Sequence, residues 1–303
     1  MNATAEQKVI LVLGMHRSGT SVIARTLGLC GGDLPKTTQP PIDPNGKQQW
    51  EPDVIVRSHD RELLEPKGRR WHDVVGLPRS WFQSDEAAAF KRRLATAYRE
   101  EFDSARMSVL KDPRICRLLP LWLPIIRELP ADPYAVILVR SPLEVAASLK
   151  ERNRMSLRKA LSIWLRHFLE AEHDTRDIPR CFVSYEDLLD DWRVVIGHIN
   201  RDLALDLRPP TSAVADDISR YVSRDVRNHQ ISNETLASRT DVPAEIKLVY
   251  QWADRACHAG PDNSEILDRA MAECVTEDAA GDRLRSIYRF WRRRRQIFHS
   301  HKS

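Results

Sequence analysis

The chain has 303 residues, 42% of them hydrophobic, so it can bury a substantial core and requires no more than one large domain with an appendage. Its 47 basic and 43 acidic residues leave a formal charge of +4, which argues against a polyanion-coating protein but leaves room for a local anion site. Five scattered cysteines without a CxxC pair argue against a disulfide framework and a structural zinc site, and no early apolar stretch reaches the length of a signal-peptide core or a membrane span. We therefore expect a soluble, cytoplasmic protein.

The first predicted element is a buried strand from Lys8 to Leu13. Its sequence, KVILVL, shows no polar alternation, which is typical of a strand covered on both faces. Gly14 ends this strand, and Ser21 to Leu27 is predicted to be a helix that stops at Gly28. A strand, a loop of phosphate size and a helix therefore follow one another.

The region from Asp33 to roughly Gln83 is rich in proline and polar residues, which predicts loops and short helices. Glu86 to Phe102 is predicted as a helix. Two further buried strands are predicted, Met107 to Leu110 and Tyr134 to Val139.

The second half of the chain continues the alternation of helices and strands. Ser141-Pro142-Leu143-Glu144 has the form of a capping box that starts a helix. A helix over about Leu157 to His173, a strand over Cys181 to Ser184 and a helix from Glu186 follow. This order predicts an α/β fold, with a P-loop-like, mostly parallel central sheet flanked by helices.

An anion-binding loop, GMHRSGTS, occupies residues 14–21 between the first strand and the first helix. There its backbone N–H groups and the positive end of the helix can surround a phosphate or a sulfate. Two glycines follow the Walker A spacing, but Thr20 stands at the lysine position and Arg17 is the loop's cation. This substitution argues against an ATP-dependent kinase or ATPase and favours a site for a shorter 5′ anion.

A second phosphate-binding element is predicted at Arg140, which ends a strand, and Ser148, which lies two helical turns further on. Both could contact one phosphate, since a guanidinium donates bidentate hydrogen bonds. The plainer alternatives are a tight turn for the glycine loop and a surface cation for Arg140.

Four motifs, GMHRSGTS, KDPR, RSPLEVAASL and YEDLL, occur in this order between about Val9 and Trp192. In these motifs the chain resembles the PAPS-dependent sulfotransferases, particularly their bacterial branch, where PAPS is 3′-phosphoadenosine 5′-phosphosulfate. The resemblance implies the sulfotransferase fold, PAPS as co-substrate, PAP as product, and no required metal. Beyond Pro209 and Pro210 the sheet-like signals stop, which predicts a PAPS-binding α/β domain over residues 1–210, with a loop-rich, acceptor-covering region over residues 33–106, and a helical C-terminal extension over residues 211–303 packed on the same domain.

The resemblance assigns nucleotide binding to the loop and to the later motifs, with Arg140 and Ser148 on the 3′-phosphate and Tyr185 near the adenine. A core role is nearly as well supported for Tyr185, and the carry-over to Arg227 and His229 is weak. The predicted nucleotide-binding residues are Gly14, His16, Arg17, Ser18, Gly19, Thr20, Ser21, Arg140, Ser148, Tyr185 and Arg227. The predicted acceptor contacts are Trp50, Lys111, Asp112 and Arg114.

Catalysis requires charge stabilisation, assigned to Arg17 and the loop, and a base for the acceptor hydroxyl. The candidate bases are Glu51, His16, His59, Asp60 and Asp112. We favour Glu51, because NGKQQWE resembles the family's N-x-G-x-W/F-E segment, although two glutamines precede the tryptophan here. A solvated glutamate is the plain alternative, and His16 is the main rival. Asp112 could instead pair with Arg114.

The favoured function is transfer of the PAPS sulfuryl group to an acceptor hydroxyl by in-line displacement. The bacterial relatives suggest that the acceptor is a glycan or a glycolipid. The alternatives are a P-loop small-molecule kinase that uses ATP, or a non-catalytic nucleotide-binding protein. Trp50, Trp71 and Trp81 could stack on an acceptor, but core filling is favoured for at least two of them. The basic run Arg292 to Arg295 could touch anionic lipid, or be a solvated helix end; no nucleic-acid partner is expected.

Overall fold

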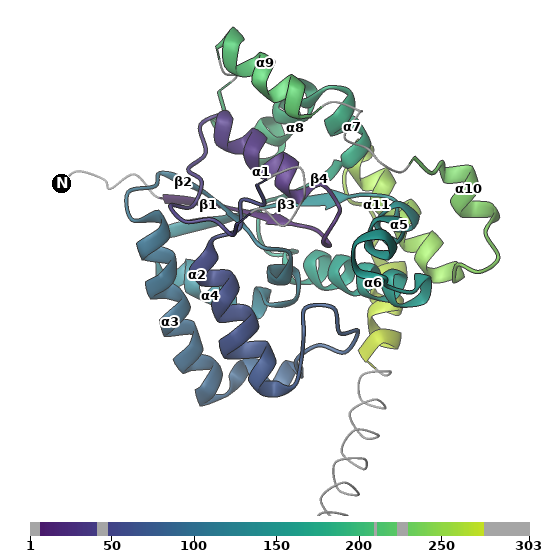
Figure 1. The fold of residues 1–303 in the computed structure, drawn as a ribbon, viewed down its shortest axis with the longest axis horizontal. Helices are drawn as coiled ribbons and strands as arrows, with labels where there is room; N and C mark the ends of the chain where they lie inside the picture. The colour runs from purple at the N-terminus through teal and green to yellow at the C-terminus, as the bar shows by residue number, and fades with distance from the viewer. Residues whose placement is uncertain (1–6, 41–47, 209–210, 223–229, 276–303) are drawn as a thin grey trace, which may run out of the picture.

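The chain folds around a four-stranded parallel sheet, which Figure 1 shows between two layers of helices. The computed structural model describes residues 7–40, 48–208, 211–222 and 230–275. The strands, in the order β2-β1-β3-β4, are β2 (Met107–Lys111), β1 (Gln7–Leu13), β3 (Ala131–Val139) and β4 (Arg180–Ser184). The predicted α/β class with a parallel central sheet flanked by helices is confirmed.

The four strands lie where the apolar runs predicted them. The largest difference is at β3, which begins three residues before the predicted Tyr134, because residues 131–133 also pair with the start of β1. β1 pairs with both β2 and β3, and β3 pairs with β4. Since all four strands are parallel, their carboxyl ends lie at one edge, which is where α/β proteins bind ligands.

The two faces of the sheet carry different helices. Ile10 and Val12 of β1 face one hydrophobic layer, whereas Val9, Leu11 and Leu13 face the other, as the two-residue period of a strand requires. The first layer contains α1 (Thr20–Leu29), α7 (Tyr185–Asp190), α8 (Trp192–Leu203) and α9 (Ser212–Tyr221). The second contains α3 (Asp85–Phe102), α4 (Leu119–Glu128), α5 (Pro142–Asn153), α6 (Leu157–Asp174) and α11 (Ala244–Ala259).

Short helical segments fill the remaining connections. Between residues 48 and 84 they are α2 (Asp53–Arg57), a π-helical turn η1 (Ser58–Leu64), and the 3-10 segments η2 (Glu65–Lys67) and η3 (Arg79–Gln83). η4 (Pro113–Arg117) follows β2, and α10 (Asn233–Ser238) precedes α11. The predicted mixture of loops and short helices before Gln83 is thus confirmed. The basic run of residues 292–295, for which a lipid contact or a solvated helix end was predicted, lies outside the described residues.

The predicted end of the first helix at Gly28 is wrong. α1 continues to Leu29, and the N–H of Cys30 donates to the carbonyl of Thr26. The turn comes at Gly31, with φ of 105°, and the Gly31-Gly32 pair is also the exit that the sequence predicts for this helix. Leu34 packs against Gly28, so the missing side chain at position 28 serves close packing within the helix.

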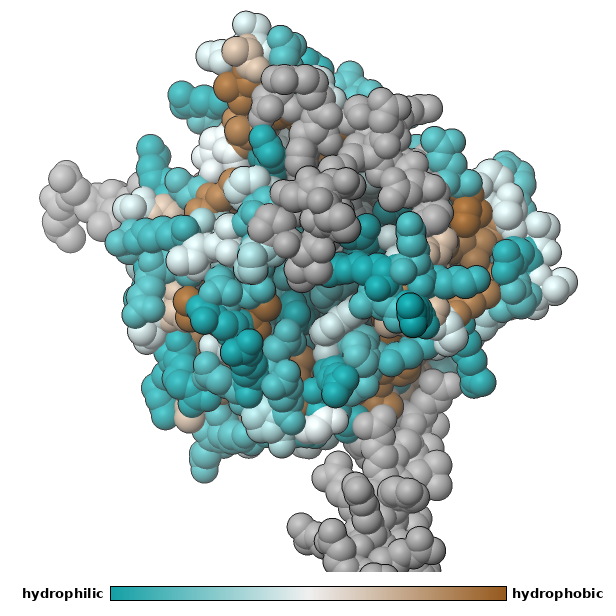
Figure 2. All heavy atoms as spheres, in the orientation of Figure 1, coloured by the Kyte–Doolittle hydropathy of each residue, from teal (hydrophilic) through white to brown (hydrophobic). Residues whose placement is uncertain are grey.

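The surface in Figure 2 is mostly hydrophilic, with hydrophobic side chains in small separate groups. The exposed large hydrophobic residues of the described chain, Val194, Leu248 and Val275, are scattered singly along the sequence, as is normal for a protein surface. In the part of the chain that the structure describes, no helix combines the length and the apolar character needed to cross a membrane.

Two glycines provide a stability test of the loop between β1 and α1. Gly19 and Gly31 both have positive φ, 93° and 105°, but a Cβ at Gly19 would lie 2.2 Å from Tyr185 Cδ2, whereas one at Gly31 would meet nothing within 4 Å. Both Gly→Ala variants incur the backbone strain, and only Gly19→Ala also overpacks. We expect Gly19→Ala to lose about 1–3 kcal/mol more unfolding free energy than Gly31→Ala in urea titrations. Equal losses would contradict the packing of Tyr185 on the loop.

Candidate functional site

The loop of residues 14–21 is tightly built. The N–H of Gly14 donates to Cys116 Sγ at 3.1 Å, and the backbone of Arg17 adopts a positive φ of 74°. The amides of Thr20 and Ser21 open α1 and have no carbonyl partner within the helix, so they are available donors at its positive end. Ser18 Oγ is buried and has no hydrogen-bond partner among the described residues. The loop therefore presents donors of the kind that bind a phosphate or a sulfate.

Arg17, Arg140 and Ser148 come together although they are far apart in sequence. Arg17 Nε donates to Ser148 Oγ at 2.8 Å, and Arg140 Nη1 donates to the carbonyl oxygen of Arg17 at 2.7 Å. β3, which ends at Val139, lies beside β1 in the sheet, and this pairing delivers Arg140 to the loop. The two predicted phosphate elements thus form one cationic cluster at the sheet edge.

Tyr185 packs into the same cluster from the end of β4. The Arg140 guanidinium lies 4.3 Å from the centre of the Tyr185 ring, a cation–π distance, and Gly19 lies against the ring's edge atoms. Tyr185 is 5% exposed. The tyrosine therefore packs between Arg140 and the loop, which agrees with the core role, while its place near an adenine stays a prediction.

The predicted capping box at the start of α5 does not form. The helix does begin at Pro142, but the side chain of Ser141 makes no cap hydrogen bond. Glu144 instead accepts from Arg140 Nε at 2.9 Å and from the amide of Ile231 at 3.0 Å. A nearby guanidinium is a stronger donor to a carboxylate than a neutral amide, and it lies four residues away, within reach on the same side of the chain.

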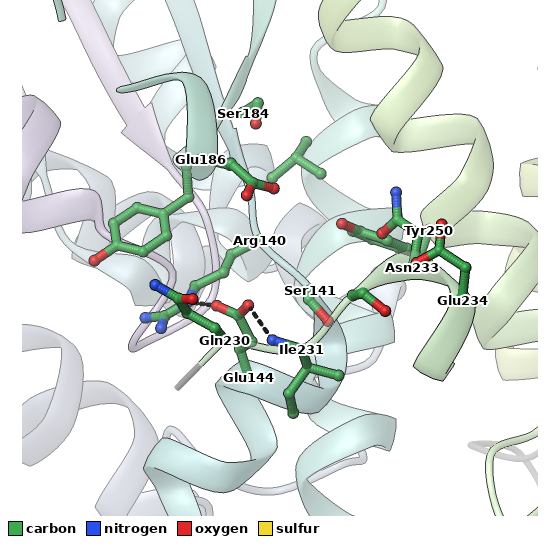
Figure 3. A pocket seen from close by; sticks show the side chains of 13 residues that line it. Arg140, Ser141, Glu144, Ser184, Glu186, Gln230, Ile231, Asn233, Glu234 and Tyr250 are labelled. Atoms are coloured by element: carbon green, nitrogen blue, oxygen red, sulfur yellow. Dashed lines mark hydrogen bonds and ion pairs between the residues drawn. The ribbon is translucent and has the colours of Figure 1, made fainter. Parts of the chain in front are cut away.

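A cavity of about 460 Å³ opens beside this ion pair, and Figure 3 shows its lining. Arg140 and Glu144 lie on one side, Ser184 ends β4, Glu186 lies in the first turn of α7, and Tyr250 comes from α11. Ser141 also lines the cavity, and its buried Oγ has no partner within the described ranges. Its volume and polar lining suit a small organic ligand. Arg227 and His229 lie outside the described residues.

Glu51 belongs to a second cluster, next to the loop. Lys111 Nζ donates to Glu51 Oε1 at 2.5 Å, to Ser21 Oγ at 3.2 Å and to the carbonyl of Gln49 at 3.0 Å. Glu51 is only 4% exposed, so the alternative of a solvated glutamate is wrong. Lys111 ends β2, the neighbour of β1, and therefore links the carboxylate to the first turn of α1.

Arg114 joins Glu51 to two aspartates. Its Nη1 lies 3.5 Å from Glu51 Oε2 and 2.8 Å from Asp112 Oδ1, while Nε and Nη2 donate to Asp60 at 2.8 and 2.6 Å. The pairing of Asp112 with Arg114, one of the alternatives that the sequence left open, is present. Burial opposes ionisation of Asp112, but the charge of Arg114 and the hydrogen bond with His59 outweigh it and hold its pKa well below the usual range.

His59 is held in one tautomer by Trp122. The indole N–H donates to His59 Nε2 at 3.0 Å, so this nitrogen carries a lone pair, and Nδ1–H donates to Asp112 Oδ2 at 2.7 Å. Both ring nitrogens are therefore engaged, and the ring is fully buried. His59, Asp60 and Asp112 support Arg114, whereas Glu51 lies next to the loop. The sequence could not indicate this arrangement, because Trp122 is 63 residues from His59.

His16, within the loop, packs against Trp71, with ring centres 4.1 Å apart and ring planes tilted by 34°. Burial, and then the charge of Arg114, hold the pKa of His16 well below its usual value, and its Nδ1 has no partner in the described chain. Trp50, at φ of 58°, lies near Arg25, and Trp81 near Lys67. Trp71 and Trp81 also pack against the core, as predicted for at least two of the three.

No protein-family model and no curated protein matches this chain. Among solved structures, the chain is similar to the sulfotransferase domain of the Synechococcus PCC 7002 olefin synthase, with 21% identity, a TM-score of 0.48, and coverage of 86% of this chain and 98% of that one. It is also similar to the sulfotransferase domain of the curacin biosynthetic pathway (13% identity, TM-score 0.44, coverage 88% and 97%). A mouse sulfotransferase complexed with PAP matches at 14% identity and a TM-score of 0.35, with coverage of 94% and 89%.

Within the described residues, no group of three or more His, Cys, Asp or Glu side chains is arranged to hold a metal ion.

The site consists of two clusters at one edge of the sheet, joined by the loop. The first contains Arg17, Arg140 and Ser148, and the second contains Glu51, Lys111 and Arg114.

The Asp112 network predicts a specific acid sensitivity. Because the folded-state pKa of Asp112 lies below its unfolded value of about 3.9, its contribution to stability is present above that value and is lost as the pH falls toward the folded pKa. We expect Asp112→Asn to lower the unfolding free energy at pH 7 by roughly 3–5 kcal/mol, since Arg114 loses a buried charge partner. The difference from wild type should shrink below pH 4 in urea titrations. Asp241→Asn, which changes an exposed aspartate, is the control, and a pH-independent difference for Asp112→Asn would contradict this account.

Proposed function

We propose that the chain is a sulfotransferase that moves the sulfuryl group of PAPS to an acceptor hydroxyl. The observation that carries the proposal is the contact of Arg17, Arg140 and Ser148 beside the loop of residues 14–21. A loop alone suits any nucleotide phosphate, but a cationic cluster beside the loop suits a nucleotide with phosphates at two positions. PAPS carries a 3′-phosphate, and ATP does not.

The proposed arrangement puts the 5′ end of PAPS at the loop and the first turn of α1. The 3′-phosphate would contact Arg140, Ser148 and Arg17, whose hydroxyl and guanidinium groups donate hydrogen bonds to phosphate oxygens. The adenosine would extend into the cavity beside Glu144 and Glu186, which is large enough for it. This arrangement places Arg17 at the 3′-phosphate, because its Nε donates to Ser148 Oγ. The sequence had assigned Arg17 to charge stabilisation at the transferred group.

Lys111 then supplies the charge that the Walker lysine would provide. Thr20 occupies the lysine position, while Lys111 reaches Ser21 Oγ from the adjacent strand. In the transfer, the acceptor oxygen forms a bond to sulfur as the bond from sulfur to the 5′-phosphate oxygen breaks, and negative charge grows on the departing PAP. Lys111 and the loop amides are the donors best positioned to stabilise that charge.

Glu51 is the proposed base that accepts the hydroxyl proton. Lys111 contacts one carboxylate oxygen and Arg114 approaches the other, so the carboxylate is held in a fixed orientation. His16 is a weaker candidate, because a lowered pKa means that its imidazole binds a proton poorly at neutral pH. We propose that His16 shapes the loop through its packing against Trp71. The acceptor class proposed from the motifs is a glycan or a glycolipid.

Arg140→Ala tests the nucleotide assignment. We expect wild type to bind PAP more tightly than ADP, and Arg140→Ala to lose roughly 10- to 100-fold in PAP affinity, because charge-assisted hydrogen bonds to the 3′-phosphate are lost. ADP affinity should change far less. Isothermal titration calorimetry measures both affinities, with exposed Arg208→Ala as control. A preference for ADP in wild type, or a preference for PAP that persists in Arg140→Ala, would sink the assignment.

Glu51→Gln tests the base. We expect unchanged PAP affinity and a loss of roughly 10²- to 10⁴-fold in kcat, because the amide cannot accept the hydroxyl proton. Transfer of labelled sulfate from PAPS to an acceptor library gives kcat, and exposed Glu128→Gln is the control. Turnover at the wild-type rate would remove Glu51 as the base without affecting the nucleotide assignment.

A further inference from the structure

Trp50 has a backbone conformation that is uncommon for a bulky residue. Its φ is 58°, in the left-handed region that favours glycine and asparagine. Among the other non-glycine residues that the structure describes, only Arg17, Arg154 and Ala204 have a positive φ. Arg17 belongs to the anion-binding loop, and Arg154 and Ala204 are the C-caps of α5 and α8, where such a conformation is common. Trp50 ends no helix, so its conformation needs another explanation.

The turn at Trp50 brings two oxygen acceptors to one ammonium group. Lys111 Nζ donates to the carbonyl of Gln49 at 3.0 Å and to Glu51 Oε1 at 2.5 Å, so the acceptors come from both sides of Trp50 in the sequence. Ser21 Oγ donates to the same carbonyl at 3.2 Å. An extended chain advances about 3.3 Å per residue and would carry Glu51 away from the Gln49 carbonyl. The positive φ shortens this segment, so both groups contact Lys111.

Glu51 itself has little freedom to make this turn. It precedes Pro52, and a residue before proline is restricted to extended conformations. The carbonyl of Glu51 also accepts from the amide of Gln39 at 2.9 Å, and Pro52 is the N-cap of α2. Because the backbone after Glu51 is fixed in this way, the direction of its carboxylate depends on the residue before it.

The indole of Trp50 holds this backbone in place. The ring packs against the hydrophobic layer that contains α1, and the guanidinium of Arg25 lies 5.7 Å from its centre. The buried Nε1 has no hydrogen-bond partner among the residues that the structure describes, so packing and the cation hold the ring. A strained backbone persists only where its surroundings determine it, and such strain is concentrated at functional sites. The side chain thus stabilises a turn that the backbone alone disfavours.

We propose that Trp50 is a positioning residue, whose left-handed turn holds the Glu51 carboxylate on Lys111 beside the loop of residues 14–21. The catalytic part of this role rests on the proposed function, in which Glu51 accepts the hydroxyl proton. Trp50 then acts through Glu51, in place of the acceptor contact that the sequence predicts for it.

Two substitutions of similar size separate the backbone conformation from the indole ring. Asparagine tolerates a positive φ, whereas β-branched threonine strongly disfavours it, and both remove the ring. We expect the kcat of Trp50→Thr to be roughly 10- to 100-fold below that of Trp50→Asn, because a misplaced base loses most of its effect. PAP affinity should be the same in both variants. Transfer of labelled sulfate from PAPS to the acceptor library measures kcat, and calorimetric titration measures PAP affinity.

Arg154 provides the matched control, because it has a φ of 53° at an exposed helix end. Arg154→Thr and Arg154→Asn differ in the same backbone preference, and we expect equal kcat for them. Trp50→Ala and Trp50→Gly differ only by a methyl group and repeat the comparison if Trp50→Thr does not fold. Equal kcat within the Trp50 pair that folds overturns the proposal, as does an equally large difference within the Arg154 pair.

A measurement without turnover separates this proposal from the proposed function. Glu51→Gln removes the charge that faces the buried Lys111 ammonium and should lower the urea midpoint of wild type. If Trp50 holds the two groups together, the same substitution in Trp50→Thr, or in Trp50→Ala, should lower the midpoint by about half as much or less. Such coupling without any turnover supports the positioning role and overturns the role of Glu51 as a base. Additive effects overturn the positioning role and leave the proposed function intact.

Discussion

The parallel pairing of β1 with its two neighbours is the constraint on which the site depends. Each strand delivers its polar residues at its carboxyl end, and parallel pairing brings those ends to one edge. β1 delivers the loop, β2 delivers Lys111, and β3 delivers Arg140. An antiparallel neighbour would send its terminal residue to the opposite edge, so neither cationic cluster could form beside the loop.

The charged side chains at this edge are buried, so each of them needs partners of opposite charge or hydrogen-bond partners. Arg114 is 8% exposed and Lys111 is 2% exposed, and an unpaired cation at either position would be strongly destabilising. Asp60 and Asp112 neutralise Arg114, and His59 with Trp122 orients Asp112 in turn. The π-helical turn η1 carries both His59 and Asp60 toward β2, which is in keeping with the frequent occurrence of such turns at functional sites.

The two clusters differ in what they leave for a ligand. In the network of Arg114, the carboxylates and carbonyls match the cations, so it holds Glu51 in place and has little attraction left for an anion. Around Arg140, the Glu144 carboxylate accepts a hydrogen bond from the guanidinium, and Arg140 in turn donates to the carbonyl of Arg17. In the proposed function, the nucleotide phosphates lie at this cluster and the acceptor hydroxyl lies at Glu51. The buried Oγ atoms of Ser18 and Ser141, the residues that follow Arg17 and Arg140 in the sequence, have no hydrogen-bond partner in the described chain.

The sequence by itself determined the four strands, the start of α5 and the loop, because unbroken apolar runs and Gly or Pro boundaries depend on local chemistry. It also pointed to Lys111 and Arg140 through motifs at strand ends, to Ser148 in the helix that follows Arg140, and to Glu51 through the NGKQQWE segment. Only the tertiary structure decided which of them meet: Arg17 bonds to Ser148, 131 residues away, and Trp122 sets the tautomer of His59. The failed capping box has the same cause in part: Glu144 accepts from Arg140, four residues away, and also from the amide of Ile231, 87 residues away, which only the tertiary structure brings to it.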